Sequence, residues 1–291
     1  MKDQTWRALQ DFMPVSAPNL KPITPFIKTN CQNYCKYLKG KPENLSSTDL
    51  HIKKHSYGLR ILITFAETIK IMKVNIIGGS NSVFNQFISE IRCEVIQKDP
   101  MRFRKNLQRL GEIFAYEISK VMDYETTEIK TPLGIAKVAT LVQHPVLATI
   151  LRAGLPLQQG LLNVFDHAEN AFISAYRKYD AAGEFHIEFE YLASPSLDGK
   201  VVILSDPMLA SGASMEIGYR ALLEKGTPKQ VHLVVVIAST QGVEYVAKHI
   251  TAENVTLWIG AVDPDMTHLS YIVPGLGDAG DLAFGAKIDS H

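Results

Sequence analysis

VVILSDPMLASGAS, residues 201–214, joins an apolar run, a carboxylate and a series of small residues. The run from Val201 to Leu204 is apolar throughout, which predicts a parallel strand covered on both faces. Asp206 follows at the carboxyl end of that strand, where open α/β sheets place their ligands. Pro207 has no N–H group to donate, so we expect the strand to end there.

Small residues fill the loop between this strand and a helix expected to start near Ser214. The backbone N–H groups of residues 210–214 and the positive end of the helix would form a phosphate cradle. A carboxylate beside such a cradle suits a phosphorylated sugar. The alternative is an ordinary strand-to-helix turn. The chain has no GxxxxGK[ST] loop and no GxGxxG turn opening a helix, which excludes Walker-type and Rossmann-type phosphate sites.

A second segment, YIVPGLGDAGDLAFG (residues 271–285), contains several glycines and a proline. This composition predicts a rigid, tightly turned loop. Backbone N–H and C=O groups held in such a loop could read the edge of a flat heterocycle, and a pyrimidine suits fixed donors and acceptors. The alternative is a glycine-rich surface turn near the C-terminus.

A third segment, ILRAGLP, places Arg152 directly after an expected strand at residues 146–151. The planar guanidinium of an arginine can clamp a diphosphate, and Ala153 and Gly154 would let backbone amides approach it. Taken alone, a surface arginine at a helix start would explain this segment better. Agreement with the two other segments favours the diphosphate site, and Arg177 in SAYRKY is a fourth candidate.

These segments resemble the type I phosphoribosyltransferases, and in particular the uracil phosphoribosyltransferases. DPMLASGAS is similar to the common family sequence DPMLATGGS, with Ser211 in place of Thr and Ala213 in place of Gly. Pro207 matches the uracil phosphoribosyltransferases, whereas most other type I phosphoribosyltransferases carry a second acid at this position. The resemblance implies transfer of the 5-phosphoribosyl group from phosphoribosyl diphosphate (PRPP) to N1 of uracil. The products would be UMP and diphosphate, in pyrimidine salvage.

The resemblance also implies roles for individual residues. Asp206 would hold the ribose hydroxyls, and the Asp278 carboxylate would face PRPP and its metal. The expected catalytic residues are Asp206, Asp278 and Arg152. The expected PRPP-binding residues are Arg152, Arg177, Asp206, Pro207, Met208, Leu209, Ala210, Ser211, Gly212, Ala213, Ser214 and Asp278. The expected uracil-binding residues are Ile272, Gly277, Asp278 and Ala279, acting largely through backbone groups.

The chain shows no direct metal-ligand motif, so we expect Mg²⁺ to arrive bound to PRPP, with most ligands from the substrate and water. Two alternative functions stay open. One is a phosphoribosyltransferase for another base. The other is a non-catalytic regulator that senses PRPP or UMP on the same fold, with an RNA partner.

Composition fits a globular protein of 291 residues with a formal net charge of zero. This balance argues against nucleic acid or an anionic membrane as a partner. Three cysteines do not form a disulfide framework, no apolar stretch reaches membrane-spanning length and no signal peptide is evident. We expect a cytoplasmic protein. Family members assemble as homodimers or larger homo-oligomers, and some respond to GTP, so both properties are open here.

The chain divides near residue 72. Residues 1–71 are rich in Pro, Asn, Ser, Thr and Lys and carry no family motif. We predict an N-terminal extension that is disordered or arises from an upstream start, with Met72 as the natural start. The alternative is a genuine accessory segment. Residues 72–291 are expected to form the uracil phosphoribosyltransferase domain.

Alternating strand and helix patterns predict an α/β fold with a doubly wound, mostly parallel sheet. A β-arm at residues 184–192 and a small hood made by the C-terminal loop would cover the site. Right-handed crossovers would bring Arg152, Arg177 and Asp206 to one edge of the sheet. Strands are expected at residues 137–142, 146–151, 171–176, 201–206, 231–239 and 255–262. Helices are expected at residues 81–97, 99–122, 155–165, 214–225 and 241–249.

Overall fold

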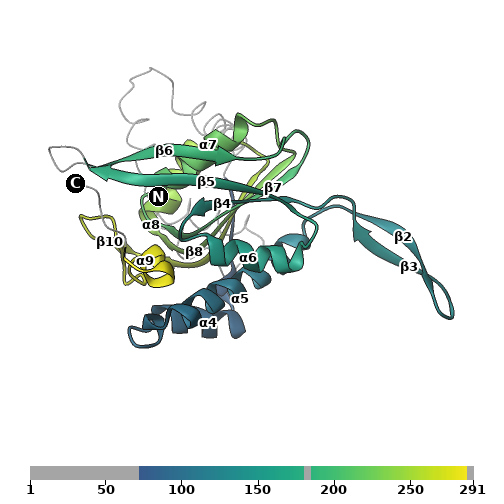
Figure 1. Ribbon diagram of the computed structural model, residues 1–291, viewed down its shortest axis with the longest axis horizontal. Helices are drawn as coiled ribbons and strands as arrows, with labels where there is room; N and C mark the ends of the chain where they lie inside the picture. Colours follow the sequence, from purple (N-terminus) through teal and green to yellow (C-terminus); the bar gives the residue numbers. More distant parts are fainter. Residues whose placement is uncertain (1–71, 180–184, 287–291) are drawn as a thin grey trace, which may run out of the picture. The chain divides into compact units, whose positions relative to one another are not determined.

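The computed structural model describes residues 72–179 and 185–286, with side chains described outside 175–190. The predictions for residues 1–71 lie outside this part of the chain. A seven-stranded sheet forms its centre, in the order β1-β9-β8-β7-β4-β5-β6 (Figure 1). All neighbouring strands are parallel except β5 and β6. The strands are β1 (Lys73–Ile76), β4 (Val146–Leu151), β5 (Glu169–Tyr179), β6 (Phe185–Ala193), β7 (Val201–Leu209), β8 (Gln230–Ser239) and β9 (Val255–Asp263).

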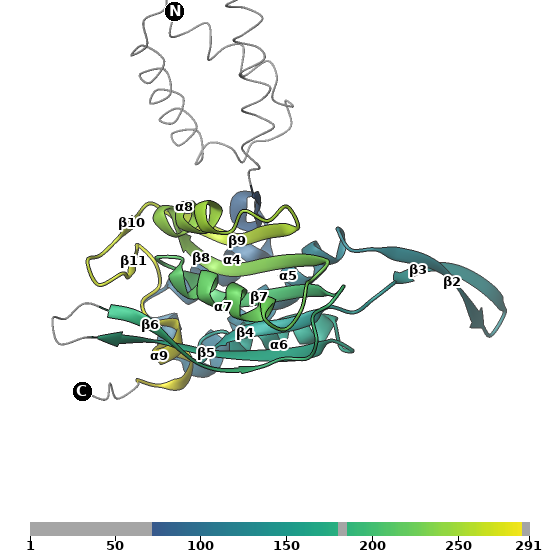
Figure 2. The same ribbon diagram turned by 90° about the horizontal axis from the view of Figure 1, so that it is seen from above.

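Helices cover both faces of the sheet, so the predicted doubly wound α/β architecture is confirmed (Figures 1 and 2). Successive apolar residues of β7 point to opposite faces. Val201 and Ile203 join a core with α4, α5 and α6, whereas Val202 and Leu204 join a core with α7 and α8. The helices are α4 (Val83–Arg92), α5 (Pro100–Ser119), α6 (Leu155–Val164), α7 (Ala213–Leu223), α8 (Thr240–His249) and α9 (Ala279–Phe284).

The helix predicted for residues 81–97 is shorter in the structure. Ser82 caps α4 by accepting the Phe84 N–H, and Cys93 leaves the helical conformation with an extended backbone. A single 3₁₀ turn, η3 (Ile96–Lys98), follows. By contrast, the Asp99–Pro100 start predicted for α5 is confirmed, because the Asp99 side chain accepts the N–H groups of Met101 and Arg102.

A two-stranded hairpin extends away from the sheet, and its position corrects one prediction. β2 (Tyr124–Thr131) pairs only with β3 (Gly134–Leu141), so the strand expected at residues 137–142 does not belong to the central sheet. Figure 1 shows the hairpin projecting well beyond α5 and α6. The apolar residues of β3, such as Ile135 and Val138, fit a free hairpin as well as a strand of the central sheet, so the sequence did not separate the two.

The β-arm predicted for residues 184–192 corresponds to β6. This strand lies at the edge of the sheet and pairs antiparallel with β5 from Phe172 opposite Ala193 to Tyr179 opposite Phe185. β5 is longer than expected because it continues into this ladder. Strands β5 and β6 reach past the carboxyl ends of their neighbours (Figure 2).

Two short strands, β10 (Asp265–Met266) and β11 (Ile272–Val273), pair with one another before the C-terminal helix α9. A 3₁₀ turn, η2 (Ile77–Gly79), follows β1. Within residues 72–179 and 185–286, no helix combines the length and the apolar character that crossing a bilayer requires.

Candidate active site

The carboxyl ends of four parallel strands meet at one edge of the sheet. In the ladders, Thr149 of β4 lies opposite Ser205 of β7, and Ser239 of β8 lies opposite Asp263 of β9. The segments that leave β4, β7 and β9 begin with Arg152, Ala210 and Pro264. The predicted convergence of the diphosphate and phosphate loops at one edge therefore follows from strand order and register.

Asp206 lies in β7, not after its end. The strand continues to Leu209, and its pairing with β8 resumes at Met208 opposite Ile237. The expectation that Pro207 ends the strand is wrong. Pairing between β4 and β7 stops at Ser205, so the following residues border β8 alone and a proline at such an edge removes no ladder bond. The Asp206 carboxylate accepts the Met208 N–H at 3.2 Å.

The small-residue loop turns tightly into α7, as the predicted phosphate cradle requires. Gly212 has φ +87°, a conformation that glycine adopts without cost. α7 begins at Ala213, and in the described chain only Ser270 among non-glycine residues has a positive φ. Ala213 therefore fits where the common family sequence has glycine. The Ser211 hydroxyl accepts the Ala213 N–H at 3.5 Å.

The neighbouring helix α8 supports this loop from behind. The Ser239 hydroxyl donates to the Ala210 carbonyl at 2.6 Å and accepts the Gly242 N–H at 2.8 Å. A Cβ on Gly212 would lie 2.9 Å from the Tyr245 ring, so the loop packs against α8 without room for a side chain at residue 212. One hydroxyl thus caps α8 and fixes the loop at the same time.

Arg152 lies at the sheet edge and touches the C-terminal segment. Its Nη2 donates to Asp281 Oδ1 at 3.2 Å and to the Gly285 carbonyl at 3.3 Å. A Cβ on Gly280 would lie 3.9 Å from both the Arg152 guanidinium and Ala153 Cβ. The diphosphate loop and the predicted base loop are therefore direct neighbours. Sequence reasoning did not single out Asp281, whose carboxylate now faces the arginine.

The C-terminal segment is more regular than the predicted loop. Asp278 Oδ1 accepts the Asp281 N–H at 3.0 Å and so caps α9. The Ile272 side chain is buried in the core, which leaves only its backbone for a ligand. Gly275 and Gly277 have φ values of +57° and +92°. Positive φ at both positions explains the glycines in this turn.

Arg92 and Asp263 form a charged pair that sequence reasoning missed. Two Arg92 nitrogens contact the two Asp263 oxygens at 2.8 Å each, and Arg92 Nη1 also donates to the Gly275 carbonyl at 2.9 Å. Asp263 Oδ2 accepts the Gly275 N–H at 2.8 Å. A carboxylate at the end of β9 was a usable signal for Asp263, but no sequence pattern marks its partner on α4.

A second network joins α4 to α5. Arg102 donates to both oxygens of Glu90, at 2.7 and 3.0 Å, and Asn106 donates to Oε2 at 2.7 Å. These hydrogen bonds lower the pKa of the Glu90 carboxyl from its usual 4.5 to about 2. These bonds join α4 and α5 into one layer.

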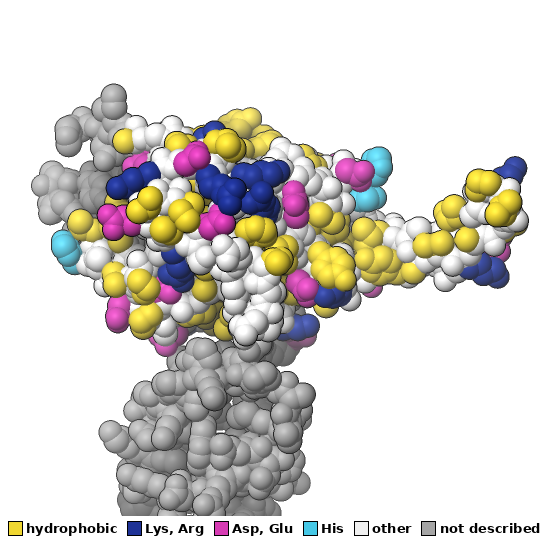
Figure 3. Space-filling view, turned by 90° about the horizontal axis from the view of Figure 1, so that it is seen from below, with side chains coloured by type: hydrophobic (Ala, Val, Ile, Leu, Met, Phe, Trp, Pro, Cys, Tyr) yellow, Lys and Arg dark blue, Asp and Glu magenta, His cyan; other side chains and the backbone are white. Residues whose placement is uncertain are grey.

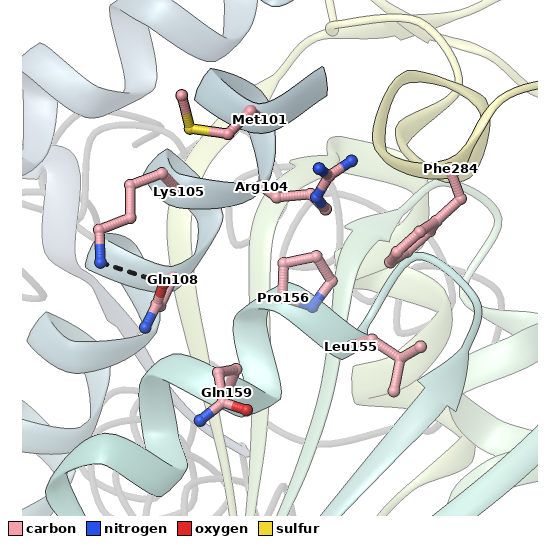
Figure 4. Close-up of a pocket in the computed structure, with 8 residues that line it drawn as sticks. All are labelled: Met101, Arg104, Lys105, Gln108, Leu155, Pro156, Gln159 and Phe284. Carbon is pink, nitrogen blue, oxygen red and sulfur yellow. Dashed lines mark hydrogen bonds between the residues drawn. The ribbon is translucent and has the colours of Figure 1, made fainter. Parts of the chain in front are cut away.

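A pocket of about 370 Å³ lies beside the sheet edge, between α5, the first turn of α6 and α9 (Figure 4). Arg104 and Lys105 contribute charge, while Leu155, Pro156 and Phe284 contribute apolar walls. Lys and Arg side chains gather on the side of the molecule that carries α4 and α5 (Figure 3). Arg104 also donates to the Ala283 carbonyl at 2.6 Å.

Arg177 lies in β5 opposite Ile187. Its side chain is outside the described part, so its expected contact with PRPP stays a prediction. In the described residues, no three His, Cys, Asp or Glu side chains cluster as metal ligands. The acidic side chains at this edge, Asp206 and Asp278, suit a Mg²⁺ ion held mainly by diphosphate oxygens and water.

Comparison with known proteins identifies the family. The family model described as uracil phosphoribosyltransferase matches residues 80–286. A uracil phosphoribosyltransferase of Porphyromonas gingivalis is 52% identical over 217 residues, which are 75% of this chain and 100% of that protein. The chain belongs to the uracil phosphoribosyltransferase family. A second relative of that name, from Methanothermobacter thermautotrophicus, is 35% identical over 72% of this chain and 94% of its own length.

One solved structure has a fold similar to that of this chain. The AQ2163 protein from Aquifex aeolicus is similar with a TM-score of 0.65 and 29% identity. The match covers 74% of this chain and 99% of that structure. The family resemblance predicted from the four sequence segments is therefore confirmed over nearly all of the described residues.

Proposed function

We propose that this protein transfers the 5-phosphoribosyl group from PRPP to N1 of uracil, releasing diphosphate and forming UMP. One observation carries the proposal: the diphosphate loop at Arg152, the phosphate loop after Asp206 and the C-terminal segment leave one edge of the sheet, and Arg152 contacts Asp281. Family membership adds the substrate class. Residues 72–291 would act as the catalytic domain, working in the cytoplasm.

The phosphate loop would bind the 5-phosphate of PRPP. Residues 210–214 supply backbone N–H groups at the start of α7, where the helix dipole favours an anion. The Ser211 hydroxyl and the loop carbonyls are held by local bonds and by Ser239. The cradle is therefore formed before the substrate arrives, which limits the ordering cost of binding.

Asp206 would hold the ribose 2′- and 3′-hydroxyls, since a carboxylate accepts two hydroxyl hydrogens well. Its Oδ1 is oriented by the Met208 N–H. Positive charge builds on the ribose as diphosphate leaves C1′, and a carboxylate below the ring stabilises that charge. Positioning and electrostatics, not a covalent nucleophile, would supply the rate acceleration.

Arg152 and Arg177 would neutralise the leaving diphosphate. Arg152 is partly exposed and paired with Asp281 in the described structure. Binding PRPP would redirect its guanidinium from one carboxylate to a more highly charged diphosphate. A Mg²⁺ ion bound to PRPP would supply further positive charge against the diphosphate. Asp278 uses Oδ1 for the helix cap, and its second oxygen would face the metal side.

The C-terminal segment would present uracil to C1′. Gly277, Asp278 and Ala279 carry backbone donors and acceptors on a turn that is fixed by positive φ and by the start of α9. The buried Ile272 side chain leaves its backbone as the only contact from that position. Backbone reading of this kind selects a flat ring with alternating C=O and N–H groups.

Uracil-dependent release of diphosphate from PRPP tests the function, with guanine and orotate measured in parallel. We expect release with uracil and UMP as the product. Faster release with another base would favour a phosphoribosyltransferase for that base. Tight binding of PRPP or UMP without release would favour a sensing regulator. A repeat with added GTP tests the effector that the family resemblance suggests.

We also propose that the chain assembles as a homodimer or a larger homo-oligomer, and the β2–β3 hairpin supports this. An isolated two-stranded hairpin is marginal in water, yet Leu133, Ile135 and Val138 are all exposed. Figure 3 shows apolar side chains along the hairpin.

Light scattering after size-exclusion chromatography tests this assembly. Val138→Lys should shift the protein toward monomer, whereas Lys137→Arg, which keeps the exposed charge at the neighbouring position, is the control. A monomeric parent protein would contradict the assembly.

A further inference from the structure

Two arginines from the helical layer hold the two ends of the C-terminal segment 272–285. At the first end, Arg92 binds both oxygens of Asp263 and the Gly275 carbonyl, while Asp263 accepts the Gly275 N–H. Both backbone polar groups of Gly275 are therefore bonded within one closed cluster. We call Arg92, Asp263 and Gly275 the clasp.

The clasp is shielded from water. The Asp263 side chain is 7% exposed and the Arg92 side chain 22%. Charge-assisted bidentate bonds between arginine and carboxylate are strong and geometrically specific. Lysine is a point charge on a flexible stem and does not reproduce the planar fork. The clasp therefore fixes the orientation of the Gly275 peptide groups as well as their position.

At the second end, Arg104 of α5 donates from Nη1 to the Ala283 carbonyl at 2.6 Å, and its guanidinium carbon lies 6.0 Å from the centre of the Phe284 ring. Gly277, Asp278 and Ala279 lie between the two arginine contacts. The backbone groups expected to read the base therefore lie between one contact from α4, at Gly275, and one from α5, at Ala283. Neither arginine touches the phosphate loop by any described hydrogen bond.

We propose that Arg92 and Arg104 are positioning residues that set the register of the base-reading backbone and so determine the affinity for uracil separately from PRPP; this rests on the proposed function. The reason is geometric. Backbone donors and acceptors recognise a flat ring only when several of them keep their spacing, and small displacements at a reacting centre are costly. Loss of the clasp releases the Gly275 turn while residues 206–214 keep their own supports.

The kinetic test measures KM for uracil and for PRPP in Arg92→Lys. Losing about one charge-assisted hydrogen bond should raise KM for uracil about tenfold. KM for PRPP should stay within about twofold, because interactions with that substrate are not changed. Arg104→Gln removes one carbonyl contact, so a smaller rise in KM for uracil is expected. A parallel rise in both KM values, or no change in either, would overturn the proposal.

Arg102→Lys is the matched control. Arg102 makes a bidentate contact with Glu90 at 2.7 and 3.0 Å, so the change removes the same kind of interaction from the same helical layer. Its hydrogen bonds reach Glu90 and Asp99, not the C-terminal segment. KM for uracil should match that of the parent. A rise equal to that of Arg92→Lys would show that general loosening of the layer is responsible.

Amide hydrogen exchange gives a readout that needs no turnover. In Arg92→Lys, amides of residues 275–284 should exchange faster than in the parent, while those of residues 206–214 should not change. Arg102→Lys should leave both segments unchanged. Unchanged exchange in Arg92→Lys would refute the clasp even if the enzyme is active. Faster exchange in Arg92→Lys, together with a parent protein that forms no UMP, would support the clasp and reject the proposed function.

Discussion

The phosphate loop and the C-terminal segment both line the candidate active site, but they are held by different kinds of contact. In the phosphate loop, the Asp206 and Ser211 side chains bond backbone groups two residues away in the sequence. In the C-terminal segment, the contacts of Arg92, Arg104 and Arg152 join residues 183, 179 and 129 positions apart. Ser239 is a distant support of the phosphate loop, but its other bonds are local, whereas the C-terminal segment depends mainly on arginines far away in the sequence.

This difference explains how each half should respond to change. A locally closed loop keeps its shape when distant helices move, and it is sensitive to changes in its own backbone. A segment supported from other elements depends on those elements staying in place. The following predictions test this contrast.

The largest effect is expected for Asp206→Asn. Asparagine keeps the size and the acceptor for the Met208 N–H but removes the charge next to the ribose. We expect turnover to fall by about 10²- to 10³-fold, as for loss of other preorganised electrostatic groups. Binding of ribose 5-phosphate should weaken far less than turnover falls, since the 5-phosphate contacts remain. Steady-state kinetics with calorimetry checks this, and full turnover would remove Asp206 from the site.

Gly212→Ala should break the local half of the site. A non-glycine residue at φ +87° costs about 1–2 kcal/mol. Its Cβ would also press on the Tyr245 ring and the Gly242 carbonyl, at 2.9 and 3.0 Å. We expect the variant to unfold at a lower urea concentration than the parent. Its KM for PRPP should rise more than its KM for uracil. Ala213→Gly, one residue later at negative φ, is the control and should lose less than about 1 kcal/mol.

In the C-terminal segment, Asp278→Asn should separate the effect of the Asp278 charge from its role as the cap of α9. Asparagine caps a helix about as well as aspartate, so α9 and the melting temperature should be preserved. Loss of the carboxylate facing PRPP should lower kcat about tenfold, the size expected for one charge-assisted contact. Normal kcat at unchanged stability would limit Asp278 to a structural role.

The smallest effect is expected for Glu90→Gln, which probes the layer behind the clasp. The folded pKa of Glu90 is about 2, below its usual 4.5, so the ionised form stabilises the folded protein above pH 4.5. This stabilisation is lost as pH falls from 4.5 toward 2. At pH 7 the variant should be less stable by about 1 kcal/mol. Urea unfolding across pH should show the difference narrowing in acid; a constant difference would contradict this origin.

Most central strands and helices could be predicted because their signal is local. The apolar run of β7 and the three-and-four spacing of α5 depend on which faces are buried. Errors occurred where the environment decided. β7 passes through Pro207 because its pairing with β4 stops at Ser205, and β3 lies outside the central sheet because, among the described residues, it pairs with β2 alone. The first turn of α9 is capped by Asp278, a residue expected only in ligand binding.

The candidate site divides in the same way. Asp206, Gly212 and Arg152 stand out in the sequence because strand ends followed by small or charged residues mark ligand sites in α/β folds. Arg92, Arg104 and Asp281 do not stand out. On an amphipathic helix, an arginine that supports a loop and an arginine that faces water have the same spacing. Their roles appear only when the distant partner is known.

The amino-acid sequence by itself determined the family, the strand-and-helix order and the chemistry of the phosphate loop, since periodicity, turn residues and short-range hydrogen bonds depend on near neighbours along the chain. The tertiary structure decided which charges meet. Coulomb attraction and hydrogen bonding depend on distance in space, so Arg152 could find Asp281, and Arg92 could find Asp263, only after the sheet had brought their elements together.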